Sequence, residues 1–280
     1  MVSHLNELSI FIINLQRSVE RKAHMQGLCE KLRLNPIFVG AIDGSGIERD
    51  DVDKICSKES VIKTIGRQLS AGEIGCALSH KGIYQKIVDE NIELTLVLED
   101  DVEFDKELLE VLKLVDEFPA DWEVVLLGHH GGASRHSPTN GSLWGRKYLS
   151  SVYKTIRPCE VACGTYGYLI NQQGAVKLLN DLKCIVKPID HYTGDSDHVN
   201  LYAVDPAPIQ IADDLSDNYH SMEDRKELVS NQNSLQDSGQ FSWYKRLLIS
   251  LGIFLAVRRF FDRTRLLLNK VKPLRKHKYT

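Results

Sequence analysis

Three consecutive carboxylates, Glu99-Asp100-Asp101, follow directly on the apolar run of residues 94–98, which predicts a buried strand. In open α/β sheets, side chains at the carboxyl ends of strands lie where these folds bind ligands. Three carboxylates held there repel one another, so we expect a compensating divalent cation or a ring of hydrogen-bond donors. A capped strand–helix junction with solvated acids is the alternative, but the preceding strand fixes the carboxylates in place and favours a site.

The spacing within this cluster indicates which of the three carboxylates can bind the same ion. Glu99 and Asp101 are two residues apart, so in an extended segment both reach the same side, whereas Asp100 points the other way. A hard cation such as Mn²⁺ or Mg²⁺, bound by one or two carboxylates, keeps positions open for phosphate oxygens. We therefore expect a nucleotide diphosphate at this corner.

The elements that must position the cluster are predicted as alternating strands and helices. Apolar runs predict strands at residues 8–13, 36–39, 94–98, 123–128, 166–170, 202–204 and 208–211. Helical spacing predicts helices at residues 18–32, 73–91, 105–115 and 172–182, with a short acidic helix from Asp195 and a mobile loop at 129–147. Ser70 and Glu73 form a capping box before the second of these helices. This β-α-β order predicts an α/β domain over residues 1–215.

Charge is distributed unevenly along the chain. The formal net charge is -3, yet residues 243–280 carry +10 and leave -13 on residues 1–242. An acidic body argues against a nucleic-acid partner, because a nucleic-acid binder has a basic body. Residues 216–242 are polar and predict a flexible flap or linker.

The basic tail contains an apolar run, residues 247–257, flanked by Lys, Arg and aromatic residues. It is shorter than the roughly 20 residues that span a bilayer. It therefore predicts an amphipathic helical extension, residues 243–280, lying on an anionic membrane surface. Packing of the same face against the body or a second subunit, as in a homodimer, is the alternative.

Composition gives only coarse limits. Apolar residues make up 42% and charged residues 26%, which excludes a wholly disordered chain and a multi-span membrane protein. The six cysteines include no CxxC pair and favour reduced thiols, and the N-terminus shows no signal-peptide pattern. We expect a cytoplasmic protein, peripheral at the inner membrane face.

Five motifs in order carry a family resemblance. They are FIINLxRxxxR at residues 11–21, AIDG at 41–44, LSAGEIGCALSH at 69–80, VLEDDV at 97–102 and GYLI at 167–170. Together they resemble glycosyltransferase family 25, the lipooligosaccharide galactosyltransferases of Gram-negative bacteria, over about residues 8–215. The resemblance implies a GT-A-like, Rossmann-type nucleotide-sugar-binding domain with a mixed sheet. It also implies UDP-galactose as donor, a divalent metal, and transfer to a terminal sugar of a lipid-linked oligosaccharide with inversion.

Metal and donor residues are assigned on these motifs. The usual acidic motif of such folds is Asp-x-Asp, and here Glu99 stands at its first position. We assign Asp101 as the metal ligand, Glu99 as a weaker ligand or ribose acceptor, and Asp100 to donor binding. A late histidine, His220, would complete the metal shell, with a solvated loop residue as its alternative.

Basic and polar residues after the first two strands are candidates for the donor's phosphates and nucleoside. Asn14, Arg17 and Arg21 follow the first strand, and the two arginines share one face of a helix start. Guanidinium groups suit phosphate and the uracil edge. Asp43 ends the second strand, where an acid accepts hydrogen bonds from ribose or base; a plain turn is the alternative.

The long helix carries further candidates. Glu73, Gly75 and Ser79 are assigned to donor binding, although Glu73 has its capping role as an alternative. Gly75 inside a helix costs roughly 1 kcal/mol against Ala, which a close approach of donor or neighbouring backbone would explain. His80 is favoured as a hydrogen-bonded scaffold residue over a ligand or base.

An inverting transfer needs a general base for the acceptor hydroxyl. Asp190, on a later loop, fits this role, with Asp195 and Asp197 as rivals. Two other functions stay open. A sugar nucleotidyltransferase would carry a Gly-rich phosphate loop, which residues 14–17 do not form. A catalytically silent sugar-binding or scaffold protein would bind UDP without turnover.

Overall fold

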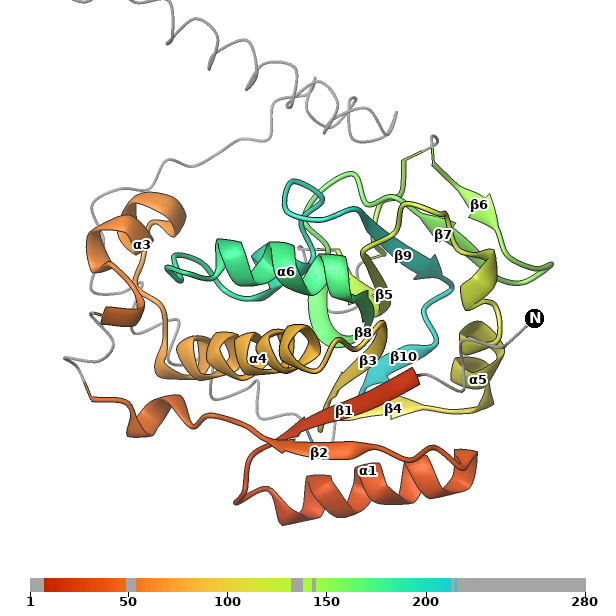
Figure 1. Ribbon diagram of the computed structural model, residues 1–280, viewed down its shortest axis with the longest axis horizontal. Coiled ribbons are helices and arrows are strands. Elements are labelled where there is room, and N and C mark those ends of the chain that lie inside the picture. Colours follow the sequence, from red (N-terminus) through yellow and green to blue (C-terminus); the bar gives the residue numbers. More distant parts are fainter. Residues whose placement is uncertain (1–7, 49–53, 132–137, 143–144, 213–214, 216–280) are drawn as a thin grey trace, which may run out of the picture.

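An eight-stranded mixed sheet forms the centre of the molecule (Figure 1). The computed structural model describes residues 8–48, 54–131, 138–142, 145–212 and 215. Across the sheet the strands are β2 (Ile37–Gly40), β1 (Leu8–Asn14), β3 (Leu94–Glu99), β8 (Cys163–Asn171), β5 (Val124–His130), β9 (Leu201–Asp205), β7 (Lys154–Ile156) and β6 (Lys147–Tyr148). A second, two-stranded sheet pairs β4 (Val102–Phe104) with β10 (Ile209–Ile211) in antiparallel order.

Strand direction determines which chain ends meet. Strand β1 is parallel to β2 and β3, and β8 is antiparallel to β3 and β5. The carboxyl ends of β1, β2, β3 and β5 therefore lie at one edge of the sheet together with the amino end of β8. Asn14, Glu99 and Thr165 come from three of these ends, so the register brings residues far apart in sequence to one edge.

Helices cover both faces of the sheet (Figure 1). Helices α3 (Lys58–Ile65), α4 (Ala71–Asp89) and α6 (Gln172–Asp181) pack on one face, where Phe11 and Ile13 point. Helices α1 (Val19–Leu32) and α5 (Lys106–Leu112) pack on the other, with Ile10 and Ile12. Because both faces are buried, the inner strands are continuous apolar runs rather than alternating patterns. Short helical segments lie at η2 (Gly44–Gly46), η3 (Val115–Glu117) and α7 (Asp190–Thr193).

The predicted α/β class with a mixed sheet is confirmed, and most predicted strands and helices lie within a few residues of those observed. Strand β4 and helix α3 were not predicted. Strand β5 extends through His130, so the loop expected at 129–147 begins later. The predicted flap and basic tail, residues 216–280, lie outside the described residues.

The short helix expected from Asp195 is wrong in position, because α7 ends before that residue. Gly194 follows α7, and its amide donates to the Asp190 carbonyl over 2.8 Å. Its own carbonyl accepts from the Ala162 amide over 2.9 Å, and a Cβ at Gly194 would lie 1.8 Å from the Ala162 oxygen. Close packing against residue 162 therefore ends the helix there.

Within the part of the chain that the structure describes, every helix is too short or too polar to cross a bilayer.

Candidate active site

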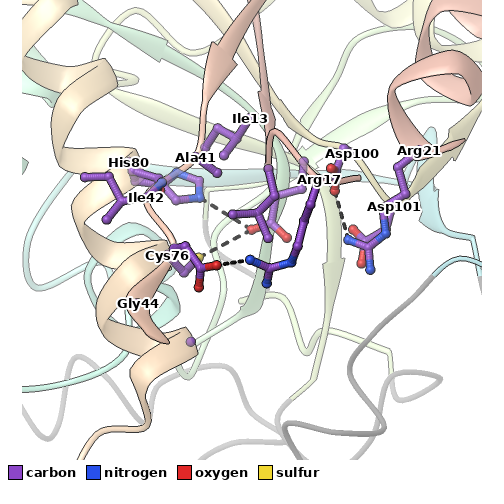
Figure 2. A pocket seen from close by; sticks show the side chains of 15 residues that line it. Ile13, Arg17, Arg21, Ala41, Ile42, Gly44, Cys76, His80, Asp100 and Asp101 are labelled. Atoms are coloured by element: carbon purple, nitrogen blue, oxygen red, sulfur yellow. Dashed lines mark hydrogen bonds and ion pairs between the residues drawn. The ribbon is translucent and has the colours of Figure 1, made fainter. Parts of the chain in front are cut away.

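A pocket opens at the edge where β1, β2 and β3 end (Figure 2). Its volume is about 180 Å³. That is less than the roughly 300 Å³ at which pockets for whole drug-sized ligands begin, so the pocket is smaller than a site for a whole ligand of that size. Seven of the residues predicted from the sequence line it, namely Arg17, Arg21, Asp43, Ser79, Glu99, Asp100 and Asp101.

Asp100 is held by two donors from the first β-α unit. Its Oδ2 accepts from Asn14 Nδ2 over 2.6 Å, and its Oδ1 accepts from Arg21 Nη1 over 3.0 Å. The carboxylate is buried and the Arg21 side chain is 14% exposed, so water screens this ion pair only weakly. Strand β3 ends at Glu99, and all three acidic residues line the pocket, but Asp100 is held by Asn14 and Arg21 whereas Glu99 contacts other partners.

Arg17 and Arg21 do not share one helix face as predicted. Helix α1 begins at Val19, which leaves Arg17 in the turn before it. Arg17 pairs with Asp43, while Arg21 pairs with Asp100. Asp43 also accepts from the Ser45 amide and hydroxyl at the start of η2. The turn expected at Asp43 is thus present. The Arg17 guanidinium, which pairs with Asp43, lines the pocket from the turn before α1.

Asp101 is a buried carboxylate that lines the pocket together with Glu99 and Asp100. Burial raises its pKa to about 7, with contributions from the charges of Glu99 and Asp100 and an opposing one from Arg21. The carboxylates of Glu99, Asp100 and Asp101 therefore lie close enough to repel one another, and the Arg21 guanidinium partly offsets this repulsion. This donor set fits a hard divalent cation, which binds carboxylate oxygens and relieves their repulsion.

Gly75 and Ser79 hold the loop after β2 against α4. A Cβ at Gly75 would lie 2.5 Å from the Ile42 carbonyl oxygen and 2.6 Å from the Gly44 nitrogen. Ser79 Oγ accepts from the Ile42 amide over 2.8 Å and donates to the Gly75 carbonyl over 2.7 Å. The backbone approach expected at Gly75 is therefore present, and both residues shape the wall of the pocket.

Glu73 is used elsewhere. Its Oε2 accepts from the Ser70 amide over 2.9 Å, and its two oxygens accept from the guanidinium of Arg67, each over 2.7 Å. The capping box predicted with Ser70 is confirmed. The buried side chain of Glu73 does not line the pocket, which supports its capping role over donor binding.

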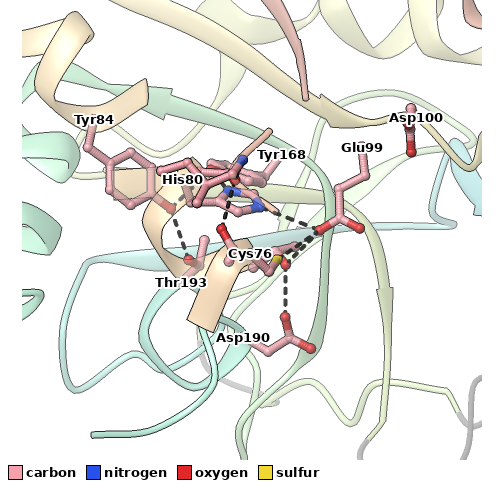
Figure 3. Close-up of polar contacts among 12 residues, drawn as sticks. Cys76, His80, Tyr84, Glu99, Asp100, Tyr168, Asp190 and Thr193 are labelled. Atoms are coloured by element: carbon pink, nitrogen blue, oxygen red, sulfur yellow. Dashed lines mark hydrogen bonds and ion pairs between the residues drawn. The ribbon is translucent and has the colours of Figure 1, made fainter. Parts of the chain in front are cut away.

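Glu99 connects the pocket to a network behind it (Figure 3). Its Oε1 lies 3.4 Å from His80 Nε2 and 3.3 Å from Thr165 Oγ1, and it accepts from Cys76 Sγ over 3.9 Å. Thr165 Oγ1 also lies 2.8 Å from Asp190 Oδ1. Burial, with the charges of Glu99, Asp190 and Asp101, raises the pKa of Cys76 well above its usual value. The thiol is therefore neutral and donates to Glu99.

Asp190 stands closest to this network among the three candidate bases. It begins α7 and reaches Glu99 through Thr165. Asp195 instead accepts from the Asp197 amide over 3.0 Å and lies 3.9 Å from Lys187 Nζ, and Asp197 is exposed. The geometry therefore favours Asp190 over its two rivals. His220, assigned to the metal shell, lies outside the described residues.

Sequence reasoning missed Cys76 and Thr165. Cys76 lies four residues before His80, so both occupy one face of α4, and this spacing was a usable signal. Thr165 had no local signal, because it reaches Glu99 only through the antiparallel pairing of β8 with β3.

Comparison with known proteins identifies the family. The family model described as "Glycosyltransferase family 25 (LPS biosynthesis protein)" matches residues 7–193, about two thirds of the chain. The chain belongs to glycosyltransferase family 25. The family resemblance inferred from the five motifs is thereby confirmed, and the pocket described above lies within the matched residues.

Curated relatives match the same part of the chain. Procollagen galactosyltransferase 2 of Homo sapiens is 29% identical over 178 residues, 61% of this chain and 27% of the human protein. A glycosyltransferase 25 family member of Aedes aegypti is 32% identical over 194 residues, 65% of this chain and 30% of that protein. The human inactive glycosyltransferase 25 family member 3 is 30% identical over 128 residues, 42% of this chain and 21% of that protein. The matched segment thus spans less than a third of each relative.

Proposed function

We propose that this glycosyltransferase transfers galactose from UDP-galactose to a terminal sugar of a lipid-linked lipooligosaccharide, with inversion at the anomeric carbon and assistance from Mn²⁺ or Mg²⁺. The observation that carries the proposal is the meeting of Glu99, Asp100 and Asp101 with Arg17 and Arg21 in one pocket. Relatives named as galactosyltransferases support galactose as the transferred sugar.

The carboxylates would hold the metal. Asp101 and Glu99 are the ligands in this proposal, and Asp100, fixed by Asn14 and Arg21, positions the turn that carries Asp101. When bound, the cation supplies positive charge against the diphosphate leaving group. Arg17 is 64% exposed and sits at the pocket rim, where its guanidinium can bind phosphate oxygens beside Asp43.

Asp190 is the proposed general base. Its carboxylate is half-buried, and its Oδ1 is held by Thr165 Oγ1 over 2.8 Å. A carboxylate fixed in this way can accept the proton of the acceptor hydroxyl as that oxygen attacks the anomeric carbon. Thr165 acts on the reaction through Asp190 and is a positioning residue.

The GT-A-type architecture, the cytoplasmic location and the contact of residues 243–280 with anionic lipid belong to the same proposal. The tail's part rests on its charge pattern, with eleven Lys and Arg against one acidic residue, Asp262. Such a tail would place the pocket next to a lipid-linked acceptor.

Release of UDP from UDP-galactose, measured with and without Mn²⁺ and acceptor, tests the proposal. We expect release that requires both. A nucleotidyltransferase would release pyrophosphate from UTP and a sugar phosphate instead, and a silent protein would bind UDP without turnover.

Asp190→Asn tests the base. We expect turnover to fall by about two to four orders of magnitude while the Kd for UDP stays nearly unchanged. Asp197→Asn, an exposed acid seven residues later, is the matched control and should keep near-normal turnover. Near-normal turnover in Asp190→Asn would exclude Asp190 as the base.

A further inference from the structure

Cys76, His80 and Glu99 bring a sulfur, an imidazole nitrogen and a carboxylate oxygen within 4.8 Å of one another. The Glu99 Oε1 lies 3.9 Å from Cys76 Sγ and 3.4 Å from His80 Nε2. Tetrahedral Zn²⁺, with bonds of about 2.3 Å to sulfur and about 2.0–2.1 Å to nitrogen or oxygen, requires ligand atoms roughly 3.3–3.6 Å apart. The three side chains therefore approach zinc geometry with small side-chain adjustments.

The hydrogen bonds of His80 fix which nitrogen faces Glu99. The Tyr168 hydroxyl donates to the Tyr84 hydroxyl over 2.9 Å, so its oxygen accepts from His80 Nδ1, 2.8 Å away. In a neutral imidazole, Nε2 then carries a lone pair directed at the Glu99 carboxylate (Figure 3). His80 is fully buried, so a proton on Nε2 or a metal ion bound to it can occupy the space between this nitrogen and the Glu99 carboxylate.

The ligand types determine which ion fits. Thiolate and imidazole ligands select Zn²⁺, whereas Mg²⁺ and Mn²⁺ prefer carboxylate, carbonyl and water oxygens. The bond from His80 Nδ1 to the Tyr168 hydroxyl is the kind of outer contact that orients metal-bound histidines. Cys76, His80 and Glu99 all line the pocket, which leaves access for the ion and a fourth position for water.

We propose that Cys76, His80 and Glu99 form a Zn²⁺ site in the wall of the pocket, separate from the carboxylates of Asp100 and Asp101. On binding, the Cys76 thiol releases its proton to solvent and its sulfur bonds to the ion. His80 Nε2 supplies its lone pair, and Glu99 supplies Oε1.

Occupation of this site takes Glu99 away from the donor. Zn²⁺ therefore weakens binding of UDP in the presence of Mn²⁺, and Zn²⁺ acts as an inhibitor. This consequence rests on the proposed function, whereas the binding of Zn²⁺ itself does not.

Titration of the full chain with Co²⁺, a spectroscopic substitute for Zn²⁺, tests the site. We expect a sulfur-to-cobalt charge-transfer band in the near ultraviolet that Zn²⁺ abolishes. Cys76→Ser should lose the band, and Glu99→Gln should weaken Zn²⁺ binding at least about tenfold, since even outer-shell changes cost 10–100-fold. Cys184→Ser removes an exposed thiol and is the matched control, which should keep the band.

Circular dichroism of each variant checks that it is folded. Absence of the band in the wild-type chain, its persistence in Cys76→Ser or its loss in Cys184→Ser would overturn the site. If Zn²⁺ binds but leaves the Kd for UDP with Mn²⁺ unchanged, the inhibitory role is overturned. If UDP does not bind even without Zn²⁺, the proposed function fails while the zinc site stands.

Discussion

Replacement of Gly75 by alanine tests the packing that shapes the pocket. The new Cβ would lie 2.5 Å from the Ile42 carbonyl oxygen and 2.6 Å from the Gly44 nitrogen. Non-bonded heavy atoms pack at about 3.5–4.0 Å, so the loop must retreat by about 1 Å. Both clashing atoms are backbone, and Ser79 holds the Ile42 amide in place, so no side-chain rotation relieves the contact.

Gly82 provides the matched control on the same helix. A Cβ there meets nothing within 4 Å. Both substitutions gain about 1 kcal/mol of helix propensity, so Gly82→Ala should stabilise the protein by about that amount. Gly75→Ala adds an overpacking cost of about 1–3 kcal/mol. The difference in free energy of unfolding between the two variants therefore isolates the contact and should be about 1–3 kcal/mol.

Urea unfolding of both variants, with UDP binding measured by calorimetry, provides the assay. Gly75→Ala should be the less stable variant and should bind UDP more weakly, because the displaced loop carries Asp43. Gly82→Ala should bind UDP like the wild type. Equal stability of the two variants would refute the close packing of the loop on α4.

Two further predictions concern buried acids. The pKa of Asp101, about 7 when folded, exceeds the roughly 3.9 of an unfolded aspartate, so the folded chain binds more protons and loses stability as pH rises from about 4 to about 7. The Asp101→Asn side chain cannot ionise. Its Tm minus the Tm of the wild type, measured with a chelator present, should therefore rise as the pH increases from about 4 to about 7. A constant difference in Tm would contradict the assigned pKa. Arg67→Ala removes the guanidinium that pairs with the buried Glu73 carboxylate and should cost about 3 kcal/mol in urea unfolding. Additional Glu73→Gln should recover part of that loss, and an Arg67→Ala variant as stable as wild type would refute the pairing.

Elements with strong local signals were predictable from the sequence. The capping box of Ser70 and Glu73 is local, and the apolar run of β3 is buried on both faces, so pattern and structure agree there. Helix α3 carried usable signals that were overlooked. Its cap Ser57 accepts from the Ser60 amide, and Gly66 ends the helix in the left-handed conformation.

Elements and side-chain directions that depend on contacts between residues far apart in the sequence could not be predicted. Strand β4 has three residues and forms only by pairing with β10, about a hundred residues later, so no local pattern reveals it. The direction of Asp100 depends on Asn14 and Arg21, which approach it because β1 and β3 are parallel neighbours. The motifs were enough to name candidate residues. That Glu73 lies outside the pocket could not be predicted from them, because its side chain is held by Arg67.

Diffraction at the manganese edge from crystals soaked with UDP and Mn²⁺ tests the central claim most directly. The account predicts an anomalous peak between Asp101 and Glu99, with the UDP diphosphate bound to the same ion. A peak elsewhere, or UDP bound away from the ends of β1 and β3, would contradict the proposed role of the three carboxylates.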